Sequence, residues 1–241
     1  MTYFRDTKAF RAVREQFMKA DFLYQPYHKL LKYIGKQKSN RINRRRNRDF
    51  LRYGRTMLDD VCRAVAPLET EIFCDYGTLL GLVRGGDLIP HDLDLDMGIV
   101  PDDKFSWEEL ERVLGTIGLV KSRQFSMDGR ITEQTYDRQG VSIDFFLHDI
   151  VGDEMVVYSY FQDPDVAYPN RKTYSVNEYH TCIVHGTKMQ EINGLHVLIP
   201  ENSEEFLEDA YGSDWRIPNP NHSYNQNVKY GVPGKFGTFD M

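Results

Sequence analysis

The alternation of apolar and acidic residues in LDLDMGI (93–99) constrains the fold more than any other feature of this chain. In a strand, Leu95 and Met97 would occupy one face while Asp94 and Asp96 occupy the other. The two aspartate Cα atoms would then lie about 6.6 Å apart, since a strand rises roughly 3.3 Å per residue. Carboxylates this close repel each other unless a proton or a cation lies between them, and a hard divalent cation is the usual solution. A solvent-facing acidic edge is the structural alternative.

The residues before this strand predict a phosphate-binding turn. A short strand over 71–75 leads into Gly77-Thr78, which opens a helix that a Gly-Gly pair ends. The free N–H groups of a helix N-terminus suit a phosphate, and glycine lets the ligand approach the backbone closely. An ordinary N-cap at Thr78 is the alternative. Arg84 could reach a phosphate with its planar guanidinium, or it could be a surface arginine near the end of the helix.

A further carboxylate is expected to join this site from a later strand. Asp144 interrupts the apolar run IDFFL, where a charge is costly unless it is paired or bound to a metal. A neighbouring strand could bring it opposite Asp94 and Asp96, although backbone donors alone could also satisfy it. Asp92 precedes the strand, so a turn or cap role is as consistent with its position as a metal role.

Together these motifs resemble the nucleotidyltransferase fold and, more narrowly, the LicD family, to which the fukutin-related glycan phosphotransferases belong. The motifs that carry the resemblance are GTLLGLVR (77–84), IPHDLDLD (89–96), IDFF (143–146), and YGSDW (211–215) followed by Pro218. The resemblance covers about residues 72–218 and is specific in its first half. Two positions depart from the family pattern: His91 stands where the family has tryptophan, and Leu93 replaces the middle aspartate.

The resemblance implies a fold, an activity and a set of roles. The fold class is α+β, a nucleotidyltransferase-like mixed β-sheet flanked by helices, and it is preceded by an N-terminal basic helical segment that lies outside the resemblance. The implied activity is transfer of a phospho-alcohol, such as phosphocholine, ribitol phosphate or glycerol phosphate, from a CDP-activated donor to a hydroxyl of a cell-surface glycan, capsule or teichoic acid. A nucleotidyltransferase acting on protein or RNA, and a non-catalytic module that binds an anionic glycan, are the alternatives.

The resemblance also implies a role for each of the candidate residues. Asp94, Asp96 and Asp144 would hold Mg²⁺ or Mn²⁺, with Asp144 alternatively acting as general base. Gly77, Thr78 and Arg84 would bind the donor phosphates, which makes Arg84 part of the catalytic set. His91 and Asp92 are candidates for substrate contact, although His91 could instead replace the family's tryptophan in packing.

Charge is distributed unevenly along the chain. Residues 29–55 hold 11 Lys and Arg against one acid, a charge of +10. Since the whole chain has a net charge of −6, the remaining residues together carry −16. We expect either contact with an anionic polymer or membrane surface, or a helix face that pairs with the acidic remainder. The acidic remainder argues against a specific nucleic-acid partner. We predict a basic helical extension (1–55) and a catalytic domain (56–241).

The remaining patterns predict local structure and location. Residues 4–34 read as helical with a break near Gln25-Pro26, residues 36–49 as a solvated helix or a mobile stretch, 183–200 as a hairpin, and the tail after Gly212 as an ordered loop. Three scattered cysteines fit a reducing compartment, and no apolar segment is long enough for a membrane span or a secretory signal. The expected location is the cytoplasm, including the inner face of the membrane.

Overall fold

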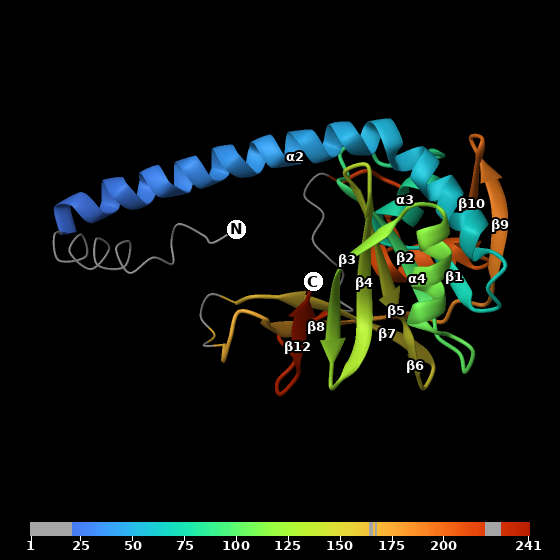
Figure 1. Ribbon diagram of the computed structural model, residues 1–241. Helices are drawn as coiled ribbons and strands as arrows, with labels where there is room; N and C mark the ends of the chain where they lie inside the picture. The colour runs from blue at the N-terminus through green and yellow to red at the C-terminus, as the bar shows by residue number, and fades with distance from the viewer. Residues whose placement is uncertain (1–20, 164–165, 167, 220–227) are drawn as a thin grey trace. The chain divides into compact units, whose positions relative to one another are not determined.

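The protein is seen in a computed structural model that describes residues 21–163, 166, 168–219 and 228–241 (Figure 1). The chain divides into two units, Met1–Arg45 and Arg46–Met241, and the site discussed below lies in the second unit. The domain boundary predicted after residue 55 falls inside helix α2 (Asp21–Val65) and stays a prediction.

The described residues form a mixed α+β structure with four helices and a large curled β-sheet (Figure 1). Helix α2 passes through Pro26 without interruption, so the predicted break there is wrong, because a helix can continue past a proline with one hydrogen bond missing. Residues 4–20 of that predicted helix lie outside the described residues. The other helices are α3 (Tyr76–Gly85), α4 (Trp107–Thr116) and α5 (Ser203–Tyr211).

The large sheet has ten strands, and β11 pairs with β8 beside its main path. Along that path the strands run in the order β1 (Glu71–Cys74), β2 (Asp94–Val100), β5 (Val141–Leu147), β4 (Arg130–Arg138), β3 (Val120–Met127), β12 (Phe236–Asp240), β8 (Thr173–Cys182), β7 (Glu154–Phe161) and β6 (Asp149–Val151), and β11 is Val228–Lys229. A separate antiparallel pair, β9 (Thr187–Ile192) and β10 (Leu195–Pro200), confirms the predicted hairpin.

The tail contains two strands, so the prediction of an ordered loop after Gly212 is wrong in part. Strand β12 lies between β3 and β8 and is antiparallel to both, while β11 pairs with β8. Asparagine, proline and glycine dominate the tail and hide the short alternating segment FGTFD. Its pairing partners lie far away in the sequence, and a local pattern does not reveal them.

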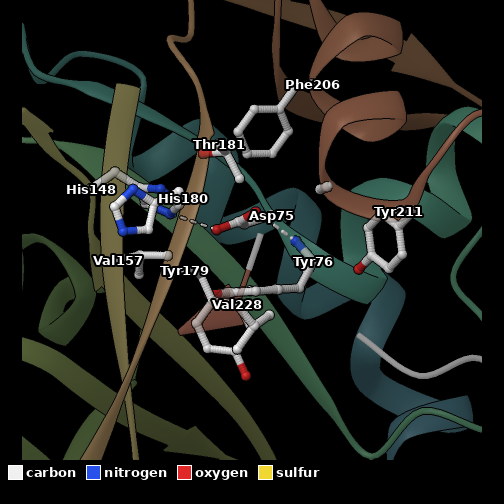
Figure 2. Close-up of a pocket in the computed structure, with 11 residues that line it drawn as sticks. Asp75, Tyr76, His148, Val157, Tyr179, His180, Thr181, Phe206, Tyr211 and Val228 are labelled. Atoms are coloured by element: carbon white, nitrogen blue, oxygen red, sulfur yellow. Dashed lines mark hydrogen bonds and ion pairs between the residues drawn. The ribbon is translucent and has the colours of Figure 1, made fainter. Parts of the chain in front are cut away.

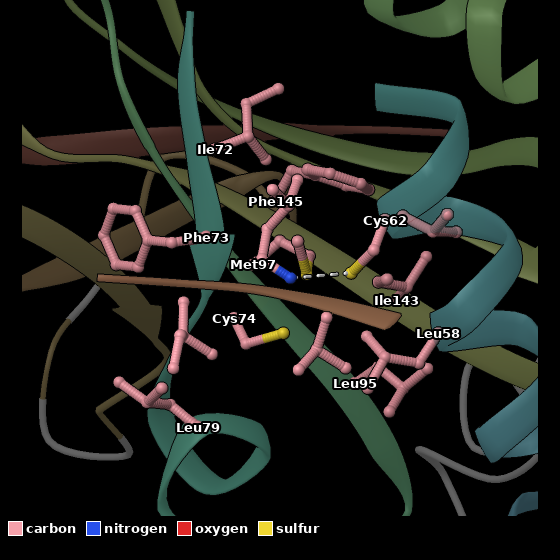
Figure 3. Packing of buried hydrophobic residues seen from close by; sticks show 14 of the residues in the cluster. Leu58, Cys62, Ile72, Phe73, Cys74, Leu79, Leu95, Met97, Ile143 and Phe145 are labelled. Carbon is pink, nitrogen blue, oxygen red and sulfur yellow. Dashed lines mark hydrogen bonds between the residues drawn. The ribbon is translucent and has the colours of Figure 1, made fainter. Parts of the chain in front are cut away.

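The hydrophobic core covers one face of β1, β2 and β5, as the alternation in the sequence predicts. Leu95 and Met97 of β2 and Phe145 of β5 are fully buried there, together with Leu58 and Cys62 from the end of α2 (Figure 3). The acidic side chains of β2 and β5 therefore point to the opposite face of the sheet. Helix α3 connects β1 to the loop before β2 and so brings its N-terminus to this acidic edge.

Candidate active site

Strands β2 and β5 bring the predicted carboxylates together. The two strands pair in parallel, with Asp96 directly beside Asp144 and Asp94 beside Ser142. Neighbouring strands lie about 4.8 Å apart, and residues in register on them point to the same face. Asp94, Asp96 and Asp144 therefore share one face, as the sequence predicts.

Negative charge is concentrated around Asp96. Burial raises its pKa well above the ordinary value, and the carboxylates of Asp144, Asp94, Asp75 and Asp92 raise it further. Burial also raises the pKa of Asp144, against the opposing effect of its hydrogen-bonded partners. The carboxylates of this cluster repel one another when they are charged. A bound cation would relieve this repulsion, so the cluster favours cation binding.

Two arginines that the sequence analysis missed partly balance this charge. Arg46 of α2 lies 3.0 Å from Oδ2 of Asp94, and Arg123 of β3 lies 3.2 Å from both carboxylate oxygens of Asp144. The hydroxyl of Thr135 donates to Asp144 and accepts from Nε of Arg123 at 2.7 Å. The strand register beside β5 places Arg123 and Thr135 here, so only knowledge of the strand order could have identified them.

Helix α3 is capped by Asp75 rather than by Thr78. Oδ1 of Asp75 accepts a hydrogen bond from the Tyr76 N–H at 2.7 Å. The Thr78 hydroxyl is buried and accepts from the Asp96 N–H at 2.9 Å, which ties the helix to β2. A Cβ on Gly77 would lie 3.0 Å from Oδ2 of Asp92, so glycine allows this carboxylate close to the helix N-terminus, where an anion is favoured.

Arg84 and His91 line a cleft of about 280 Å³ between α3 and the loop after α5. Nη1 of Arg84 donates to the carbonyl oxygen of Trp215 at 3.4 Å. Arg84 lies seven positions after Gly77 in the helix, which is about 10 Å along the axis. The two predicted phosphate-binding elements are therefore at different ends of α3. Burial raises the pKa of Asp92, and the charge of Asp94 adds to this effect, whereas His91 and Arg84 lower the pKa.

A buried aspartate–histidine pair lies beneath the start of α3 and was not predicted. Nε2 of His148 and Oδ2 of Asp75 are 2.7 Å apart, and both side chains are almost fully buried. They line a small cavity of about 30 Å³ with Thr181 (Figure 2). Among the described residues, His148 Nδ1 and Thr181 Oγ1 are buried without a hydrogen-bond partner. A cavity of this size, with polar groups in its wall, has room for an ordered water.

Glu133 is a second unpredicted acid near the cluster. Burial raises its pKa to about 8, and the charge of Asp144 adds to the effect while Arg123 opposes it. The unfolded chain releases this proton near the ordinary pKa of 4.5, whereas the folded chain keeps it until about pH 8. The folded state therefore binds more protons in that window, and stability falls as the pH rises through it.

Replacing Glu133 by Gln is expected to flatten this pH dependence. Between pH 6 and pH 8.5 the wild type should lose roughly 2.5 kcal/mol more free energy of unfolding than Glu133→Gln, because the slope is about 1.4 kcal/mol per pH unit at first and falls toward zero as the pH passes the folded-state pKa of about 8. Urea denaturation at both pH values measures the difference. Parallel pH profiles for the two proteins would show that Glu133 does not retain a proton in the folded state.

The donor chemistry of the acidic face fits a hard divalent cation. Asp94, Asp96 and Asp144 offer carboxylate oxygens alone, which Mg²⁺ and Mn²⁺ prefer. As the side chains stand, no three His, Cys, Asp or Glu residues in the described ranges form a group that could hold a metal. Asp94 forms an ion pair with Arg46, and Asp144 forms one with Arg123. Metal binding would therefore require these two ion pairs to rearrange.

Residues 69–202, over half of the chain, match the LicD family model, described as "LicD/FKTN/FKRP, nucleotidyltransferase domain". The chain belongs to the LicD family. The resemblance that the motifs predict is thus confirmed, and membership of the LicD family indicates phosphotransferase activity on glycans. No curated protein matches the chain.

The matched range has consequences for the individual residues. It contains α3, β2 and β5, and hence all of the predicted carboxylates, while Arg46 and Trp215 lie outside it. Among the described helices, none is both long enough and apolar enough to cross a membrane.

Proposed function

We propose that this LicD-family chain transfers a phospho-alcohol from a CDP-activated donor to a hydroxyl of a cell-surface glycan, capsule or teichoic acid. The observation that carries the proposal is the acidic face on β2 and β5, where Asp96 and Asp144 lie in register on parallel strands. A pyrophosphate donor brings negative charge of its own, so such a face can receive it only with a divalent cation. Phosphocholine, ribitol phosphate and glycerol phosphate are the candidate groups for transfer.

In this proposal Asp94, Asp96 and Asp144 hold Mg²⁺ or Mn²⁺. The ion, when bound, supplies the charge neutralisation that a pyrophosphate needs. The N–H groups at the start of α3, around Gly77 and Thr78, and the Arg84 guanidinium would hold non-bridging phosphate oxygens. His91 and Asp92 would contact substrate from the loop before β2.

The transfer forms one bond and breaks one. The acceptor oxygen attacks the phosphorus that carries the alcohol, and the bond from this phosphorus to the oxygen of CMP breaks. The acceptor proton passes to a general base, for which Asp144 is the candidate if it does not hold the metal. Arg123, whose Nη2 lies 3.2 Å from both carboxylate oxygens, would orient Asp144 as the general base, whereas metal binding by Asp144 would require this pair to rearrange.

The proposed setting is the cytoplasm, including the inner face of the membrane. There the basic residues 29–55 would contact an anionic polymer or lipid surface. Such contact should weaken steeply between low and moderate salt, because exposed charges are screened. Sedimentation with anionic vesicles at two salt concentrations measures it, and binding that does not depend on salt would argue against the contact.

A panel of CDP-alcohols tests the proposed function. The wild type with Mn²⁺ and a glycan acceptor is expected to release CMP from one member of the panel, whereas Asp94→Asn should be at least about 100-fold slower. Release of pyrophosphate from a nucleoside triphosphate would instead indicate nucleotide transfer to protein or RNA. Glycan binding without any turnover would indicate a non-catalytic module, and equal activity of both proteins would remove Asp94 from the site.

A further inference from the structure

Helix α2 contributes two adjacent side chains to the loop that leads into β2. Nη2 of Arg46 donates to Oδ2 of Asp94 at 3.0 Å and to the carbonyl oxygen of Leu93 at 3.5 Å. Nδ2 of Asn47 donates to the carbonyl oxygens of Pro90 at 2.8 Å and Asp92 at 3.1 Å. All four acceptors lie between residues 90 and 94, immediately before or at the first carboxylate of the acidic face.

The two side chains act on different properties of this loop. The single amide of Asn47 bridges the carbonyls on either side of His91, so it fixes the path of the backbone that delivers Asp94 and Asp96. Arg46 instead pairs its positive charge with Asp94 itself, at 3.0 Å from Oδ2, a carboxylate oxygen that the proposed metal would compete for. Both residues precede the part of the chain that matches the LicD family, so this support comes from the basic segment.

We propose that Arg46 is a resident counter-cation of Asp94 that a divalent metal must displace, and that Asn47 is a positioning residue that holds the loop in the metal-binding arrangement. The proposal rests on the proposed function only in taking the acidic face as a metal site. It explains why Arg46 and Asn47 contact the loop before β2 rather than solvent alone. It also gives adjacent residues opposite effects on metal affinity.

Mn²⁺ affinity without donor or acceptor, measured by electron paramagnetic resonance, tests the role of Arg46. Arg46→Gln should bind Mn²⁺ about two- to five-fold more tightly than Arg48→Gln. The substitution removes the ion pair of Arg46 with Asp94, which competes with the metal, and the effect is modest because the two side chains are 37% and 39% exposed. Arg48→Gln is the matched control: it removes the same charge from the same helix, at a side chain that is 72% exposed and paired with Asp49. The difference should shrink in 0.5 M salt.

The role of Asn47 predicts the opposite sign. Asn47→Ala should bind Mn²⁺ several-fold more weakly than the wild type and should speed hydrogen exchange of the amides at 91–94, because the loop loses both anchors. Asn43→Ala, an exposed asparagine one turn earlier in α2, is the control and should change neither property. A lower thermal midpoint with unchanged Mn²⁺ affinity would show a merely structural role and overturn this part.

The outcomes separate this inference from the proposed function. Equal Mn²⁺ affinity of Arg46→Gln and Arg48→Gln would overturn the competition, while CMP release by the wild type would leave the transferase proposal standing. Absence of Mn²⁺ binding to the wild type would overturn both. Tighter binding by Arg46→Gln together with no turnover on any CDP-alcohol would support the counter-cation and count against the transferase alone.

Discussion

Replacing Asp96 by Asn is expected to slow transfer by roughly 10³-fold while making the metal-free protein more resistant to heat. Asp96 is the centre of the acidic face, so its loss removes the carboxylate that the other members surround. Loss of one preorganised electrostatic group at an active site typically costs about 10²–10³ in rate. The gain in stability follows from the raised pKa of Asp96, since the folded state disfavours its charge and an amide has none to bury.

Because the rate of transfer should fall while the thermal midpoint rises, misfolding of Asp96→Asn would not explain the result. A damaged fold would lower both activity and the thermal midpoint, whereas the cluster predicts that only activity falls. Asp103→Asn is the matched control, because Asp103 is exposed and should leave both quantities unchanged. Thermal unfolding in EDTA and initial rates of CMP release measure the pair. Unaltered rates for Asp96→Asn would contradict the assignment of the acidic face as the active site.

The sequence predicted those parts of the site that depend on local pattern. The alternation around Asp94 and Asp96 fixes which face each side chain takes, and the apolar run around Asp144 identifies a second buried strand. Both inferences need only the period of a strand and the cost of burying a charge. The expectation that a neighbouring strand brings Asp144 close to Asp94 and Asp96 agrees with the parallel register of β2 and β5, in which Asp96 lies beside Asp144.

The partners of these acids could not be predicted in the same way. Arg46 meets Asp94 across 48 positions of sequence, and Arg123 meets Asp144 through the order of three strands. A basic helix and an isolated arginine in a polar strand carry no local sign of such contacts. Strand β12 was missed for the same reason, since its partners β3 and β8 are chosen by the tertiary fold.

The N-cap of α3 had a local signal in the sequence. Asp75, directly before Tyr76-Gly77-Thr78, has the residue type most favoured at a helix N-cap, yet the sequence analysis considered Thr78 for that role. The difference is physical, because a capping threonine would have its hydroxyl on the helix N–H groups. Here the Thr78 hydroxyl is instead committed to the backbone of Asp96. Asp75 caps the helix with Oδ1 and uses its other carboxylate oxygen, Oδ2, to contact His148.

Replacing Asp75 by Ala is expected to destabilise the protein by about 3 kcal/mol, the sum of a lost N-cap near 1 kcal/mol and a buried polar group left unpaired near 2 kcal/mol. The unpaired group is His148, whose Nδ1 has no partner in the described residues and whose Nε2 would lose its only hydrogen bond shown there. Urea denaturation should show a lower midpoint with an unchanged slope. Asp75→Asn should cost less, because the side-chain oxygen can still cap α3, and Asp137→Ala at an exposed position of β4 should stay within about 0.5 kcal/mol of the wild type. If Asp75→Ala were as stable as Asp137→Ala, the Asp75–His148 pair would not support the start of α3, and the helix terminus proposed for the donor phosphates would need another anchor.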